Sequence, residues 1–208
     1  MNEVPVAALE ARLQKLVESA RVAFERGNYD YAVDLCREVL AGAPGCLPVR
    51  KLQRAAQLKR GGGGGMAKFF GSVSTAPFLF SGNLALGKDP AKALENAQKL
   101  LEADPRSVAG LKMLGGAASA LGWHETAVFA LEALREMNPE AVETLVALGR
   151  AHLAAGRATA GVQWAEAALR LESLHPGAQA LLKDASVAQT MQQGKWGEAG
   201  DFRGKIKS

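Results

Sequence analysis

The sequence has few of the residues that build metal centres and reactive thiol sites. It contains two cysteines, Cys36 and Cys46, and three histidines among 208 residues. Neither cysteine stands in a CxxC or CxxH pattern, and the HExxH and GxSxG patterns do not occur. Neither a zinc site nor a serine hydrolase is therefore indicated. We expect a protein that is not an enzyme and that holds no metal or cofactor.

Aromatic residues are also scarce, at 6% of the chain, whereas hydrophobic residues make up 48%. Most of the hydrophobic residues are alanine and leucine, which favour helices. Extended runs of β-branched and aromatic residues, which are typical of strands, do not occur. The composition therefore predicts an all-α protein with a sizeable core. The few cysteines and a polar first segment without signal-peptide character predict a cytoplasmic location.

Acidic residues are missing from one long interval, between Glu38 and Asp89, which holds seven lysines and arginines. The net charge of the whole chain is only +4, so this is a local basic surface and not a generally basic protein. Nucleic acid is not an expected partner, because no aromatic platform or reading motif accompanies the basic residues.

A run of five glycines, residues 61–65, lies in the same interval. A phosphate-binding loop of the G-x-x-x-x-G-K-[ST] type is not indicated, because Lys68 stands between Ala67 and Phe69 and no strand precedes it. The glycines are therefore interpreted from the repeat pattern described below.

An uncharged segment of 19 residues follows, from Phe69 to Gly87. Its length is close to that of a membrane span, but Pro77, three glycines and five polar residues oppose insertion. We expect that it does not span a membrane. Association with an anionic membrane surface stays open, because Phe69 and Phe70 lie beside basic residues.

Two landmarks recur at a spacing of 34 residues. Pro105 and Pro139 are separated by this distance, and so are Gly122 and Gly156. A period of 34 residues with two helices per unit resembles the tetratricopeptide repeat (TPR). The unit that begins at Val108 carries the pattern of that family most fully, with Leu111, Leu114, Gly115, Ala118, Ala127, Leu131, Leu134 and Pro139.

The resemblance implies a right-handed superhelix of antiparallel helix pairs, each made of a helix A and a helix B, with one irregular, shortened repeat. Small residues such as Gly149 let paired helices approach closely, and Gly122 and Gly156 take the turn between helices, where φ is positive. A proline ends helix B. In the unit from Val142 the proline comes three residues late, as Pro176, which predicts a longer helix B or exit loop.

In this phase we expect an array over residues 1–193 and a glycine-rich basic tail at 194–208. The array divides into units near 13–46, 47–73, 74–107, 108–141 and 142–178, followed by a capping helix at 179–193. The unit 47–73 is the shortened one. Its glycine run takes the place of the turn between helices, and Met66–Ser74 is interpreted as a stunted helix B.

The resemblance further implies that fixed positions of helix A face a groove that binds a partner. Basic residues at these positions alternate with apolar ones, Val146 among them, and such a groove suits an extended peptide with acidic groups. An ordinary solvated face is the alternative. The asparagines of the carboxylate clamp found in some TPR domains are missing, since Ala55 and Gly116 stand in their place. The candidate groove residues are Arg21, Phe24, Lys51, Phe78, Lys112 and Arg150.

We therefore expect a non-catalytic scaffold that binds a partner protein or peptide. The alternative function is a peripheral membrane or assembly adaptor that uses the segment 50–70. Among the histidines, His152 is expected to pack between helices, and His124 and His175 to lie in loops. The candidate surface of the adaptor consists of Arg54, Lys59, Arg60, Lys68, Phe69 and Phe70.

Overall fold

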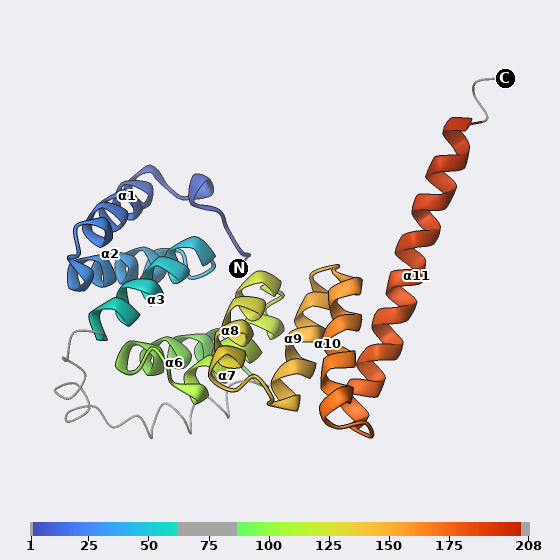
Figure 1. The fold of residues 1–208 in the computed structure, drawn as a ribbon. Helices are drawn as coiled ribbons and strands as arrows, with labels where there is room; N and C mark the ends of the chain where they lie inside the picture. The colour runs from blue at the N-terminus through green and yellow to red at the C-terminus, as the bar shows by residue number, and fades with distance from the viewer. Residues whose placement is uncertain (1, 62–86, 205–208) are drawn as a thin grey trace. The chain divides into compact units, whose positions relative to one another are not determined.

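The computed structural model describes residues 2–61 and 87–204 (Figure 1). All regular structure in these residues is helical, which confirms the predicted all-α class. The chain forms two compact units, Met1–Ala130 and Leu131–Ser208, and helix α8 crosses from one to the other. No helix within the described ranges has the length and hydropathy needed to cross a membrane.

The first unit begins with a short 3-10 helix and continues as successive helices, of which α1, α2 and α3 pack side by side. Three of its helices have the side-chain caps that their sequences favour, since Asn28, Asp89 and Ser107 each accept a hydrogen bond from the first turn. The elements are η1 (Val6–Ala8), α1 (Ala11–Glu25), α2 (Tyr29–Gly42), α3 (Leu47–Gly61), α6 (Pro90–Ala103), α7 (Val108–Ala120) and α8 (His124–Met137).

Glycine makes the tight turn in three helix pairs, as the sequence predicted for two of them. Gly27, Gly122 and Gly156 have φ of 76°, 73° and 77°. Residues other than glycine rarely adopt this left-handed backbone conformation, because their Cβ atom would crowd the following carbonyl group. These glycines join α1 to α2, α7 to α8, and α9 (Val142–Ala154) to α10 (Ala158–Leu171).

The second unit consists of the end of α8, α9, α10 and the long helix α11 (Pro176–Gly204). Its core joins the last three of these helices, because Leu145, Ala165 and Leu181 are at most 4% exposed and lie in one cluster. Gly149 is required where α9 crosses α10 and α11. A Cβ at this position would lie 2.5 Å from Cδ2 of Leu181 and 3.0 Å from Cβ of Trp164.

The prediction of a longer helix B or exit loop before Pro176 is wrong. Helix α10 has 14 residues, the same length as α6. Residues 172–175 join α10 to α11, just as residues 104–107 join α6 to α7. Pro176 is instead the first residue of α11, where a helix needs no N–H from it.

The expectations for the C-terminal tail and for the glycine run concern segments that the structure describes only in part. Helix α11 continues past Gln193 to Gly204, into the segment that the sequence analysis assigned to a tail. Gly61 is the last residue of α3. The rest of the glycine run, the stunted helix B and the start of the following unit, residues 62–86, lie outside the described residues, so the division of the chain into repeat units stays a prediction.

Candidate peptide-binding surface

On α7, the candidate groove residue Lys112 lies on a largely exposed stripe that also contains Ala109, Gly116 and Ser119. Lys112, Gly116 and Ser119 are exposed and Ala109 is half-buried, and their spacing of three and four residues places them on one face of the helix. The neighbouring residues of α7 are at most 1% exposed and form the core side, namely Leu111, Met113, Leu114, Ala117 and Ala118. Because the other residues of the stripe are small, the Lys112 ammonium can be approached along the helix.

On α9, Glu143 and Arg150 are exposed and Val146 is not. Val146 is 3% exposed and packs in the core cluster with Ala178 and Leu181 of α11. The expectation that Val146 offers an apolar contact to a ligand is therefore wrong, because α11 covers this part of α9. Arg150 remains available at the exposed edge.

Lys51 on α3 is exposed, and its ammonium lies over an aromatic ring. Its Nζ atom is 5.8 Å from the centroid of the Phe129 ring in α8. At this distance the ring attracts the cation. Phe129 was not singled out in the sequence, where no pattern distinguishes it from a core residue.

Several solved structures of TPR proteins are similar to the chain in fold. MamA from Desulfovibrio magneticus, residue 41 to the end, aligns with a TM-score of 0.53 and 15% identity, over 97% of this chain and 100% of that one. The TPR2AB domain of yeast Sti1, in a complex with pHSP90, aligns with a TM-score of 0.52 and 14% identity, over 84% of this chain and 69% of that one. The chain has the tetratricopeptide repeat fold. A TPR protein from Parabacteroides merdae aligns with a TM-score of 0.50 and 14% identity, over 86% of this chain and 60% of that one. No family model and no curated protein sequence matches the chain.

The remaining candidate groove residues of this TPR chain differ in how available they are. Arg21 is exposed and lies 3.9 Å from the Glu18 carboxylate, one turn earlier on α1. Phe24 packs against the cluster that contains Ala32, and its ring meets that of Tyr29 edge-on, with centroids 5.5 Å apart. Phe24 therefore serves the core between α1 and α2. Phe78 lies outside the described residues.

The basic interval is not one open surface, contrary to the sequence analysis. Arg50 is 4% exposed and donates from Nη2 to the Pro44 carbonyl oxygen at 2.8 Å. Burial lowers the pKa of this guanidinium to about 10. Arg54 is half-buried and donates to the Pro105 carbonyl oxygen. The arginines closest to the core therefore bind the chain itself.

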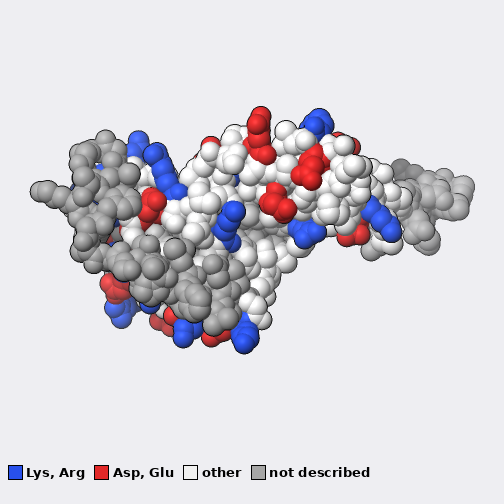
Figure 2. Space-filling view, turned by 90° about the horizontal axis from the view of Figure 1, so that it is seen from below, with Lys and Arg blue, Asp and Glu red and all other residues white. Residues whose placement is uncertain are grey.

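The other members of the adaptor surface are partly accounted for. Arg60 forms an ion pair with Asp30 at 3.2 Å, and Lys59 is exposed. Lys68, Phe69 and Phe70 lie outside the described residues. On the face shown in Figure 2, basic and acidic side chains are both present among the described atoms. The adaptor function stays a prediction.

The two cysteines are poor nucleophiles. Cys36 and Cys46 are free and buried. Burial, together with a smaller contribution from the nearby Cys46, raises the pKa of the Cys36 thiol to about 12. Burial also raises the pKa of Cys46. Since the thiolate is the reactive form, neither thiol is suited to covalent chemistry at neutral pH.

Two of the three histidines make contacts that hold the fold together. His152 stacks on Trp164 with ring centroids 6.4 Å apart, which confirms the predicted packing between helices. His124 is the first residue of α8 and not a loop residue as predicted. His175 does lie in a loop, where its Nδ1 accepts a hydrogen bond from the backbone N–H of Ala178 at 3.1 Å. Its Nε2 lies 3.0 Å from the Glu143 carboxylate and donates to it, because Nδ1 is the acceptor.

One polar cluster escaped the sequence analysis entirely. The Glu3 carboxylate accepts hydrogen bonds from the backbone N–H groups of Glu125 and Thr126, in the first turn of α8, and from the Thr126 hydroxyl. The one signal in the sequence is at the N-cap position of α8, directly before His124. Trp123 stands there, and its side chain has no acceptor for the free N–H groups of the first turn.

Proposed function

We propose that this TPR chain is a non-catalytic scaffold that binds a partner protein or peptide through the exposed positions of its A helices. The observation that carries the proposal is the stripe on α7, where Lys112 stands exposed among Ala109, Gly116 and Ser119. A row of small residues lets an extended backbone approach the helix closely, and the lysine supplies a charge for an acidic group.

Two further observations support the same function. Arg150 is exposed on α9, so the A helices of both units carry a basic side chain at a position assigned to the groove. The solved complex of the yeast Sti1 TPR2AB domain with pHSP90 is an instance of this fold with a bound partner. The likeness to that domain concerns the fold alone. The ligand that we propose, an extended acidic peptide, is predicted from the exposed residues of this chain.

The test is binding to an array of extended peptides that vary in the number and position of acidic residues. Lys112→Glu and Arg150→Glu should each weaken binding of the best acidic peptides by about tenfold or more, because a charge-assisted hydrogen bond contributes about 1.5–3 kcal/mol. Lys92→Glu and Lys183→Glu are the matched controls, since both lysines are exposed in helices and lie at other positions.

The controls should keep wild-type binding. Equal losses in all four variants would show that only the net charge matters, and unchanged binding in the first two would discard the basic residues of the A helices as the ligand site. Raising the salt concentration should weaken wild-type binding and leave the binding of Lys112→Glu less affected.

A further inference from the structure

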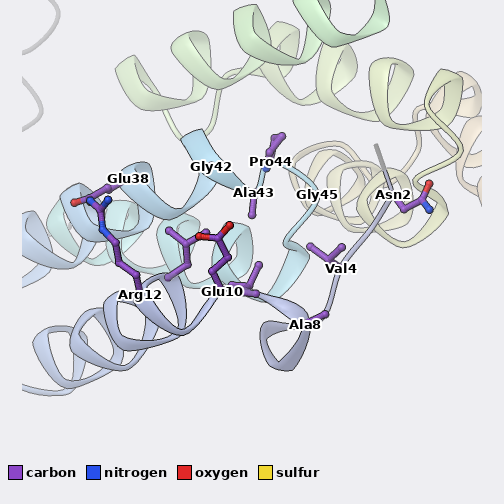
Figure 3. Close-up of a pocket in the computed structure, with 12 residues that line it drawn as sticks. Asn2, Val4, Ala8, Glu10, Arg12, Glu38, Gly42, Ala43, Pro44 and Gly45 are labelled. Atoms are coloured by element: carbon purple, nitrogen blue, oxygen red, sulfur yellow. The ribbon is translucent and has the colours of Figure 1, made fainter.

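Residues Asn2–Pro5, here called the strap, run along the loop between α2 and α3 to the start of α8. The backbone N–H of Val4 donates to the Gly45 carbonyl oxygen at 3.1 Å. The contact with Gly45 is so close that a Cβ there would lie 2.3 Å from the Asn2 carbonyl oxygen. Figure 3 shows Asn2 and Val4 on this segment as it passes Gly45. Only glycine at position 45 allows the strap to lie there.

The strap ends on α8 through one carboxylate. Glu3 accepts from the Thr126 backbone N–H at 2.7 Å, from the Thr126 hydroxyl at 2.6 Å and from the Glu125 backbone N–H at 3.2 Å. Thr126 is 1% exposed. The first turn of a helix carries partial positive charge, so its N–H groups and the buried Thr126 hydroxyl together form a set of donors that suits an anion.

A cleft of about 540 Å³ lies beside the strap (Figure 3). Its apolar side is formed by residues of the strap, of α1 and of the α2–α3 loop, and the ion pair between Arg12 and Glu38, at 2.5 Å, lies at its edge. Val4 packs on the core cluster of the first helices. The apolar lining residues are Val4, Ala8, Leu9, Leu13, Ala43 and Pro44.

The strap is thus held as a bound peptide is held, by one backbone hydrogen bond, one carboxylate and one apolar side chain. We propose that the start of α8, with Thr126, is a binding site for an acidic peptide segment in which a glutamate precedes a small apolar residue, and that the strap occupies this site as a built-in competitor. The site is independent of Lys112 and Arg150.

The probe for this site is a synthetic acetylated peptide with the sequence of residues 2–9, labelled at its carboxyl end. It is titrated against the wild type and against Glu3→Ala, in which the strap has lost its carboxylate. The peptide should bind Glu3→Ala at least tenfold more tightly than the wild type. In the wild type the tethered strap competes for the site at an effective concentration of roughly millimolar order. A peptide with glutamine in place of its glutamate should bind about tenfold more weakly or worse, since it lacks the charged acceptor.

A second change separates the site from general loosening of the fold. Thr126→Val in the Glu3→Ala background should weaken peptide binding by about tenfold, and Thr126→Ser, which keeps the hydroxyl, should restore it. Lys92→Glu, at an exposed position of α6, should leave it unchanged. If circular dichroism shows that Glu3→Ala loses helicity, Glu3→Gln is used in its place, because glutamine keeps the size of the side chain. Equal binding to wild type and released variants, no binding to any folded released variant, or equal binding of the two peptides would each overturn the proposal.

Discussion

Replacing Gly149 by alanine tests the closest helix crossing in the second unit. The new Cβ would lie 2.5 Å from Cδ2 of Leu181, 3.0 Å from Cβ of Trp164 and 3.4 Å from the Gly161 carbonyl oxygen. The Leu181 methyl group can rotate away only within a packed core, since Leu181 is 2% exposed. Trp164 Cβ is attached directly to the backbone, so α10 itself has to move.

The size of the effect follows from two opposed contributions. Overpacking a core costs about 1–3 kcal/mol, and two contacts at or below 3.0 Å place this site in the upper half of that range. Alanine in place of glycine inside a helix returns roughly 0.5–1 kcal/mol. We therefore expect Gly149→Ala to lower the free energy of unfolding by about 1–2.5 kcal/mol.

The measurement is urea unfolding followed by circular dichroism. The matched control is Gly194→Ala in α11, where nothing lies within 4 Å of the added Cβ. This control should be neutral or stabilise the protein by up to about 1 kcal/mol. If Gly149→Ala stabilised the protein as much as Gly194→Ala does, α9 could not cross its neighbours as closely as described.

Three further changes test other parts of the molecule. Gly45→Ala should displace the strap, because its Cβ would lie 2.3 Å from the Asn2 carbonyl oxygen. The Thr126 amide should then exchange its hydrogen about tenfold faster, and an unchanged exchange rate would contradict the close contact. The pKa of the Cys36 thiol is raised from 9.0 to about 12, so the free energy of unfolding should fall as the pH rises from 9 towards 12, because the thiol of the unfolded chain ionises first. Cys36→Ala should flatten this decline, and equal slopes of the free energy of unfolding against pH in the two proteins would argue against the burial. Arg54→Ala should lower the free energy of unfolding by about 1 kcal/mol through loss of the bond to Pro105, whereas Lys59→Ala, at an exposed position, should change it by less than about 0.5 kcal/mol; similar values would show that the Arg54 bond contributes little.

The repeat in the sequence was enough to predict the helical class, the TPR fold and the glycine turns at Gly122 and Gly156. This was possible because the signals are local. A glycine at positive φ, as at Gly122, and a run of alanines and leucines act within one or two helical turns. Pro176 shows the limit of such signals, because a proline favours both the residue after one helix and the first residue of the next.

The binding surface was predicted less well, because it depends on which faces other elements cover. The positions on α7 are exposed as expected of a groove face, and whether they bind a ligand stays a prediction. Val146 is a counterexample, since α11 packs over it. Arg50 and Arg54 look like surface charges in the sequence. In the structure Arg50 donates to the Pro44 carbonyl oxygen in the loop before α3, and Arg54 donates to the Pro105 carbonyl oxygen in a loop far along the chain.

By itself, then, the sequence determined the pairing of neighbouring helices, since each turn and each small residue acts on the helix next to it in the chain. Only the tertiary structure decided that Glu3 caps α8. The two are 123 residues apart where Glu3 meets Thr126, and hydrogen-bonding groups so distant leave no periodic trace in a single sequence. The strap and its site follow from that contact, which is held by a carboxylate, a hydroxyl and the amides of one helical turn.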